Sequence, residues 1–318
     1  MLKSNKIAVC LVQFVVVLCF MSCDSLLVTE LELEELVDSE FEYGMSGALR
    51  YSEQYDTLES RIRLSVVGLS SDVDHETASP ELYKDDNFVT ELYTNNNQFH
   101  SYSNLSTDST KYTPLMPGNY SLISVHPDLG SITATTVIPA NLPDLYNIKI
   151  DSISDKYNAV ITFSFNDPIE EENYYYLSFK ADYNDLTYDT LTTETDTFIR
   201  SREPLINIDD VSDNSIDISS NKHLLISDQI FNGTSYTGTQ KIRFSGRIDS
   251  LSFDEIIDAL QIEWATISKD LYLFETSYAR HLSNEFLGDF SEQTIIYSNV
   301  EGGIGYLGGI HFRDVPLP

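Results

Sequence analysis

Apolar and polar residues alternate with a period of two along much of the chain, which is the pattern of strands with one buried face. Ile62, Leu64 and Val66 alternate with arginine and serine in the first such segment. The apolar positions of four later segments are Tyr157, Ala159, Ile161, Phe163 and Phe165; Tyr175, Leu177, Phe179 and Ala181; Ile242, Phe244 and Ile248; and Leu260, Ile262 and Trp264. Residues 120–138 predict a hairpin, because turn-forming residues separate two strand-like runs. The pattern predicts an all-β fold.

One segment near the C-terminus has helical periodicity instead. Ser268 is a suitable N-cap, and Asp270 suits the positive end of a helix. The apolar residues on one helical stripe are Leu271, Phe274, Tyr278 and Leu282. We therefore predict a helix over about residues 268–286 that packs on a sheet, directly after a strand in which Trp264 is buried.

Two prolines mark a change in the pattern after the hairpin. Pro139 and Pro143 flank a short break, which places a domain boundary near residue 145. We predict two β-sandwich-like domains, residues 23–145 and 146–318, with the helix in the second. Residues 72–86 and 94–111 are polar and lack periodicity, so they are predicted to be loops.

The first 22 residues have the three parts of an export signal. Lys3 and Lys6 precede an apolar run from Ile7 to Met21, which is followed by the small residue Ser22 and then Cys23. This run is shorter than the roughly 20 apolar residues that cross a bilayer, which disfavours a permanent membrane span. Phe20-Met21-Ser22-Cys23 looks like a lipobox, in which the Cys23 thiol is acylated, with palmitate among the candidate chains, and becomes the new N-terminus. The alternative is an ordinary secretory signal with an incidental cysteine.

Composition excludes one class of partner. The chain has 50 acidic and 19 basic residues, and its net charge of −31 becomes −33 when two lysines leave with residues 1–22. Nucleic acid is not expected as a partner, because phosphate binding needs clustered Lys and Arg. The acidic excess favours a well-solvated surface, with a cation-attracting surface as the alternative.

The residues give little support for catalysis. All three cysteines lie within residues 1–23, and the six histidines are scattered singly, so neither a cysteine nucleophile nor a zinc motif is present in the mature chain. We expect no enzyme activity and no cofactor. A calcium site is the strongest of the weak metal hypotheses, since oxygen ligands crowd one short segment: Asp209, Asp210, Asp213, Asn214 and Asp217. A solvated acidic loop is the alternative.

Several segments, in this order, resemble a Bacteroidota lipoprotein family named domain of unknown function 4249. They are Thr136 to Pro139, Phe165-Asn166-Asp167-Pro168 leading to Asn173-Tyr174-Tyr175, Ser227 to Gly233, Ser268 to Tyr272, and Ser298 to Gly309. Pro117-Gly118-Asn119-Tyr120 is similar to a turn in transthyretin-like sandwiches and suggests that the first domain is Ig- or transthyretin-like. The resemblance implies an outer-membrane lipoprotein with two β domains, often encoded beside TonB-dependent transporters, and it supplies no catalytic residues.

The same motifs are interpreted as structural when they are considered residue by residue. Gly302, Gly303, Gly305 and Gly308 permit positive φ and close backbone approach, which suits a bent terminal strand. Asn232-Gly233 is a tight-turn signal. Asn173 is expected to fix a loop beside Asp167 and Pro168 through side-chain bonds to the backbone.

These observations together predict a lipid-anchored outer-membrane protein. We expect an accessory role beside a TonB-dependent transporter or another envelope protein, with the periplasmic or cell-surface face left open. The alternatives are a glycan- or protein-binding module, which exposed aromatic rows would favour, and a hydrolase, which two convergent carboxylates in a pocket would favour.

Overall fold

A computed structural model describes residues 42–67, 78, 80–94, 101–105, 112–152, 158–169, 172–181, 184–186, 197–199, 205–210, 216–219, 223–245, 260–285 and 294–317. The predicted signal peptide and Cys23 lie outside these residues.

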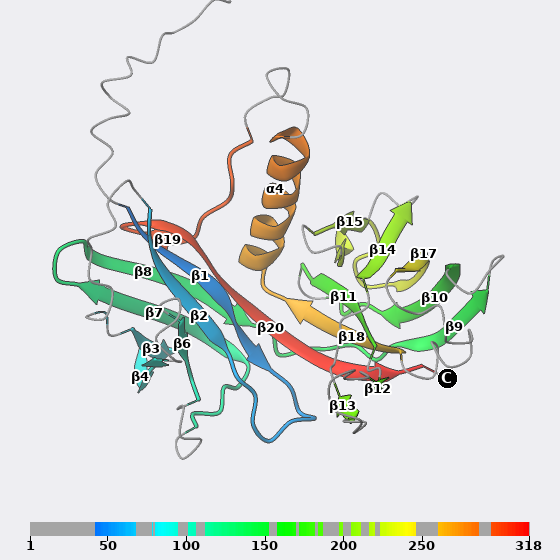
Figure 1. Ribbon diagram of the computed structural model, residues 1–318, viewed down its shortest axis with the longest axis horizontal. Helices are drawn as coiled ribbons and strands as arrows, with labels where there is room; N and C mark the ends of the chain where they lie inside the picture. Colours follow the sequence, from blue (N-terminus) through cyan, green and yellow to red (C-terminus); the bar gives the residue numbers. More distant parts are fainter. Residues whose placement is uncertain are drawn as a thin grey trace, which may run out of the picture. The chain divides into compact units, whose positions relative to one another are not determined.

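Strands dominate the described residues (Figure 1). They are β1 (Glu42–Tyr51), β2 (Arg61–Val67), β3 (Glu81–Lys84), β4 (Asn87–Glu91), β5 (Tyr93–Thr94), β6 (Ser101–Ser103), β7 (Gly118–His126), β8 (Gly130–Ile138), β9 (Tyr146–Ser152), β10 (Asn158–Asn166), β11 (Tyr174–Ala181), β12 (Asn184–Leu186), β13 (Thr197–Ile199), β14 (Leu205–Asp210), β15 (Ile216–Ile218), β16 (Leu224–Ser227), β17 (Ser235–Ser245), β18 (Leu260–Ile267), β19 (Val300–Glu301) and β20 (Ile304–Pro316). The helical elements are a 3₁₀ turn, η2 (Asp228–Ile230), and the α-helix α4 (Lys269–Glu285).

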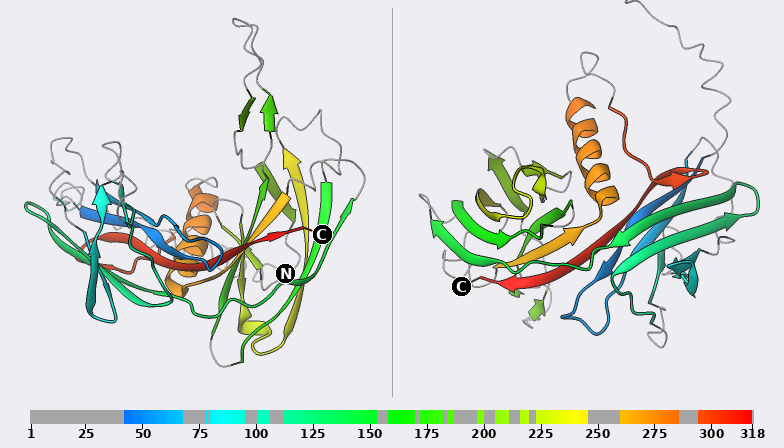
Figure 2. Two further views of the ribbon diagram at one scale, coloured as in Figure 1. Left: turned by 90° about the horizontal axis from the view of Figure 1, so that it is seen from below. Right: turned by 180° about the vertical axis from the view of Figure 1, so that it is seen from behind.

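The C-terminal strand β20 joins distant parts of the chain in one sheet (Figures 1 and 2). It pairs parallel with β1, from Gly44↔Ile304 to Tyr51↔His311, and antiparallel with β18, from Gln261↔Pro316 to Ile267↔Ile310. The resulting nine-stranded sheet has the order β15-β16-β11-β18-β20-β1-β2-β6-β5. Smaller sheets have the orders β19-β8-β7-β3-β4, β14-β17-β10-β9 and β12-β13.

Each half of the nine-stranded sheet packs against a smaller sheet. Buried residues of β1 and β2, such as Leu49 and Ile62, form one cluster with Leu122 and Ile132 of the five-stranded sheet. A second cluster joins β11, β16 and β18 to the four-stranded sheet, and Trp264 and Phe163 are fully buried in it. This is sheet-on-sheet packing, in which alternate residues of each strand fill the core.

Helix α4 covers part of the other face of the nine-stranded sheet. Leu271 packs there with Ala265, Ile267 and Phe312 in a third cluster. The Ser268 hydroxyl accepts hydrogen bonds from the backbone N–H of Leu271 (3.2 Å) and of Gly309 (3.1 Å), so the N-cap also ties the helix to β20. Within the described residues no helix is long and apolar enough to cross a membrane.

The predicted all-β fold with two sandwich-like packings and one C-terminal helix is confirmed, as are the hairpin over residues 120–138 and the burial of Trp264. The two predicted loops are wrong in part. Residues 81–84 form β3, and residues 101–103 form β6. Both strands are short, and their pairing with β7 and β2 supplies the order that their own polar sequences do not indicate.

The domain boundary near residue 145 stays a prediction. The two sandwich cores draw on residues before and after it respectively, except that Val300 and Leu307 contribute to the first core. The nine-stranded sheet continues through both predicted domains because β20 pairs with β1 as well as with β18.

The helix stripe is buried unevenly, which gives a testable difference between two leucines. Leu271 is 5% exposed, whereas Leu282, predicted on the same stripe, is 39% exposed. We expect Leu271→Ala to lower the free energy of unfolding by about 2–5 kcal/mol, the usual cost of an internal cavity. Leu282→Ala should stay within about 1 kcal/mol of wild type. Urea titrations of both variants provide the comparison, and equal losses would contradict this packing of the helix.

Candidate functional site

The glycine-rich segment lies where β19 turns into β20 and approaches two other strands. Gly302 and Gly305 have φ values of +76° and +116°. A Cβ at Gly303 would stand 2.1 Å from the Tyr43 carbonyl oxygen, and one at Gly305 would stand 1.8 Å from that of Met45. A Cβ at Gly308 would stand 2.8 Å from the Leu271 side chain. These glycines therefore give β20 its place beside β1 and α4.

Two of the sequence motifs meet at the Asp167 carboxylate, which is nearly buried. It accepts hydrogen bonds from the Tyr175 hydroxyl, from Asn173 Nδ2 (3.4 Å) and from the backbone N–H of Gly233 (2.7 Å). Asn173 Nδ2 also lies 3.4 Å from the Pro168 carbonyl oxygen. We call these contacts the Asp167 junction; they lock the end of β10 to the turn before β17.

Asp228 belongs to the same junction and is fully buried. One of its oxygens accepts the Asn173 backbone N–H at 2.6 Å, while Oδ1 has no hydrogen-bond partner among the described residues. Burial raises the pKa of Asp228, and the charges of Asp167 and Glu172 raise it further, against hydrogen bonds from Asn173 that lower it. Asn232 and Gly233, which has φ +71°, lie in the turn between η2 and β17.

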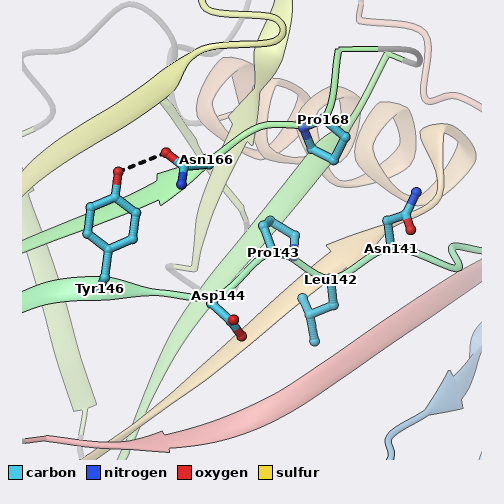
Figure 3. Close-up of a pocket in the computed structure, with 7 residues that line it drawn as sticks. All are labelled: Asn141, Leu142, Pro143, Asp144, Tyr146, Asn166 and Pro168. Atoms are coloured by element: carbon cyan, nitrogen blue, oxygen red, sulfur yellow. Dashed lines mark hydrogen bonds between the residues drawn. The ribbon is translucent and has the colours of Figure 1, made fainter.

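An open pocket of about 380 Å³ lies beside this junction (Figure 3). We call it the Pro143 pocket, and its lining residues are Asn141, Leu142, Pro143, Asp144, Tyr146, Asn166 and Pro168. The Tyr146 hydroxyl donates to Asn166 Oδ1 at 2.9 Å, and Ser235 Oγ donates to the same atom at 2.7 Å. The pocket thus combines amides, one carboxylate and one tyrosine ring.

A charged cluster occupies the face of the nine-stranded sheet that α4 partly covers. Glu263, 4% exposed, accepts from Arg50 Nη2 at 2.8 Å and from Lys180 Nζ. The Arg50 guanidinium lies 4.3 Å from the ring centroid of Phe312. Asp314 accepts from the Tyr55 hydroxyl, a bond that raises the pKa of Tyr55 to about 12. The cluster links β1, β11, β18 and β20, so its charges hold the central strands together.

A second pocket of about 420 Å³ lies at the turn between β3 and β4 and the start of α4. Asp85, Asp86 and Asp270 are among its lining residues. Asn119 Nδ2 donates to Asp85 Oδ1 at 3.1 Å, and the Tyr297 hydroxyl donates to Asp270 Oδ1 at 2.6 Å. Two of the three carboxylates are therefore already hydrogen-bonded within the fold.

The calcium hypothesis stays untested. Asp209 and Asp210 lie on β14 of the four-stranded sheet, and Asp217 lies on β15 of the nine-stranded sheet. Asp217 accepts a hydrogen bond from the Tyr272 hydroxyl at 2.8 Å. Asp213 and Asn214 lie outside the described residues, and in the part of the chain that is described no three His, Cys, Asp or Glu side chains form a metal-binding group.

Sequence reasoning singled out the Asp167 junction but neither the Pro143 pocket nor the Glu263 cluster. Asn166 stands inside the quoted motif, directly before Asp167, and an amide at the end of a predicted strand is a signal that could have been used. Glu263 lies between the apolar positions Ile262 and Trp264, where alternation in a strand with one buried face predicts a solvated residue. Its partners come from strands more than 80 positions away in sequence.

Comparisons with known proteins identify the family of the chain. Two solved DUF3823 family proteins are similar in part: one from Bacteroides ovatus ATCC 8483, with 12% identity and a TM-score of 0.19, and one from Parabacteroides merdae ATCC 43184, with 11% identity and a TM-score of 0.20. Each match covers 72% of this chain and 92% of the other. These scores carry no argument, so the fold rests on the sheets described above. No curated protein matches the chain. A family model described as Domain of unknown function (DUF4249) matches residues 54–314, and the chain therefore belongs to that family.

Proposed function

We propose that this protein is a lipid-anchored, non-catalytic component of a bacterial outer membrane that acts beside a TonB-dependent transporter. The observation that carries the proposal is Cys23, which directly follows a small residue at the end of an apolar export segment. The transporter partnership follows from the family resemblance.

The structure supports an anchored role through the place of the first described strand. Only 19 positions separate Cys23 from Glu42, where β1 begins (42 − 23 = 19). β1 lies inside the nine-stranded sheet, between β20 and β2. A lipid tether would therefore attach to a strand that is hydrogen-bonded on both sides, and such a strand resists peeling better than an edge strand.

The use of the buried acids supports a non-catalytic role. Asp167 and Glu263 accept hydrogen bonds that join loops or strands, as described above. Among the described residues that line the Pro143 pocket there is one carboxylate, Asp144, and hydrolysis of a glycosidic bond by the usual route requires two that converge.

Acylation of Cys23 is the first test. Growth with an alkyne analogue of palmitate should label the wild-type protein, and Cys23→Ala should lose the label and leave the membrane fraction. Cys19→Ala is the matched control, because Cys19 lies in the segment that processing removes. Retention of full labelling in Cys23→Ala would overturn the anchor assignment.

Purification tests the partnership separately. The acylated protein should be extracted in mild detergent, and mass spectrometry should identify a TonB-dependent transporter that accompanies it in comparable amount. Recovery of the folded, acylated protein without any such transporter would contradict the accessory role while leaving the anchor intact.

A further inference from the structure

We propose that the Pro143 pocket binds a neutral saccharide unit. The pocket is open to solvent and measures about 380 Å³, within the range of small-ligand sites. This inference goes beyond the proposed function and does not depend on the anchor or on a transporter.

The first argument is the hydrogen-bonding state of Asn166. Its carboxamide oxygen accepts from both Tyr146 and Ser235, which uses the two lone pairs of that atom. The two N–H groups of Nδ2 have no partner among the described residues, and Figure 3 shows Nδ2 turned toward the space between Tyr146 and Pro143. Asn166 therefore presents two fixed donors to a ligand.

Further polar groups come from the linker. Asp144 forms an ion pair with Arg313 through Oδ1 at 2.5 Å, and Figure 3 shows its carboxylate turned away from Asn166. The Asn141 amide, which is exposed and forms no hydrogen bond within the described residues, offers both donors and an acceptor. A ligand hydroxyl both donates and accepts, so several hydroxyls on one rigid ring match this mixture of groups.

Tyr146 supplies the apolar contact that a sugar ring needs. Its side chain is 36% exposed and has no aromatic partner among the described residues. The hydrogen bond to Asn166 fixes the orientation of the ring. An exposed, fixed tyrosine gives a large contact area at low entropic cost, and the C–H groups on one face of a sugar pack well against such a ring.

Hydrogen bonds within the fold hold both walls of the pocket in place before any ligand arrives. The Pro143 carbonyl oxygen accepts from Trp264 Nε1 at 2.8 Å and from Arg313 Nη2 at 2.7 Å. On the other side, Asn166 and Pro168 flank Asp167, whose carboxylate is held by Gly233 and Tyr175. Preorganised walls lower the cost of binding. The motif around Asp167 therefore also positions two residues of the pocket, Asn166 and Pro168.

Charge argues for a neutral ligand. None of the described residues that line the pocket is a lysine or an arginine, so an anion would lack a counter-charge among them. The one carboxylate among these described residues, Asp144, is already paired with Arg313, which reduces its attraction for a cation.

The test uses the full acylated protein in a polyoxyethylene detergent, since a maltoside detergent would present sugar head groups to the pocket. Probes are glucose, galactose, mannose, xylose and N-acetylglucosamine with their linear trimers, and glucuronic acid as the anionic comparison. Saturation-transfer NMR should detect at least one neutral probe, and titration calorimetry should give its Kd, expected between about 10 µM and 10 mM for such a shallow site.

Three variants assign the binding to the pocket. Asn166→Asp keeps the oxygen that accepts from Tyr146 and Ser235 but removes both donors, and Tyr146→Ala removes the ring; each should weaken binding of the neutral probe at least tenfold. Phe88→Ala is the control, because Phe88 is 59% exposed on the five-stranded sheet, and it should leave the Kd unchanged. Melting curves establish that all three variants are folded.

Three results would overturn the inference. These are absence of binding by every neutral probe, binding that persists unchanged in both pocket variants, and binding restricted to glucuronic acid. None of them bears on acylation of Cys23 or on the transporter.

Discussion

Gly305→Ala is expected to lower the melting temperature by more than about 10 °C or to prevent accumulation of folded protein. The new Cβ would stand 1.8 Å from the Met45 carbonyl oxygen and 2.9 Å from its carbon, and both atoms belong to a paired strand. Gly305 also has φ +116°, which side chains other than hydrogen rarely tolerate. Relief would require β20 to move away from β1, with a loss of more than about 4 kcal/mol, an exceptional value for one substitution.

Gly130→Ala is the control that separates the cost of the steric collision from the cost of the positive φ value. Gly130 is the first residue of β8, directly after the turn from β7, and has φ +87°, but a Cβ there would meet no atom within 4 Å. Its expected cost is the left-handed conformation alone, about 1–2 kcal/mol, and therefore a few degrees of melting temperature. Differential scanning calorimetry of both variants decides the matter. A Gly305→Ala protein that melts together with Gly130→Ala would show that β20 does not approach β1 this closely.

Period-two alternation sufficed to locate β2, β10, β11, β17 and β18, because each has one face in a core and one outside it. It failed for β3 and β4. Their turn uses Asp85 and Asp86 at φ +47° and +63°, values typical of a hairpin turn with two left-handed residues. An asparagine or aspartate followed by glycine is the usual signal for such a turn. Because the second position here is Asp86 and not glycine, the hairpin was not recognised. The strands themselves are short and carry charges at their ends.

The pairing between distant strands could not be predicted from the sequence, for a different reason. Local periodicity can show that a segment is a strand, but it carries no information about which strand that segment pairs with. The parallel pairing of Gly44 with Ile304 therefore emerges only from the structure. The sequence was enough to predict a structural role for the glycines. Which atoms a side chain there would collide with, such as the Met45 carbonyl oxygen, depends on the pairing of β20 with β1.

The candidate pocket was hidden for a related reason. Its walls come from the linker around Pro143 and from the end of β10, which are separated in sequence by β9. The linker looked like a plain domain break, because proline disrupts strand patterns wherever it occurs. Only the two hydrogen bonds to the Pro143 carbonyl oxygen show that this break is a fixed wall.

The two buried aspartates of the Asp167 junction should respond to mutation in opposite directions. Asp167→Ala leaves the Tyr175 hydroxyl and the Gly233 N–H without their acceptor, and each unpaired buried donor costs about 1–3 kcal/mol. We therefore expect a loss of about 2–5 kcal/mol. Asp228→Asn keeps an oxygen to accept from the Asn173 N–H and removes a buried charge whose Oδ1 has no partner among the described residues. This variant should be as stable as wild type at neutral pH, or more stable.

The difference in stability between Asp228→Asn and the wild type should depend on pH, because the pKa of Asp228 is raised in the folded state. Because the folded protein holds this proton more tightly than the unfolded chain, the stabilising contribution is fully present below the unfolded pKa of about 3.9. It is lost as the pH rises through the folded pKa. Asp228→Asn has no such proton to lose, so its stability relative to wild type should increase from acid to neutral pH.

Urea midpoints of the variant and the wild type, measured from pH 4 to pH 8 at constant ionic strength, give this difference, and the contributions of the many other acidic residues cancel in it. A difference that is flat with pH, or a variant that is less stable than wild type at pH 8, would mean that Asp228 is charged in the folded protein and that its charge is compensated there.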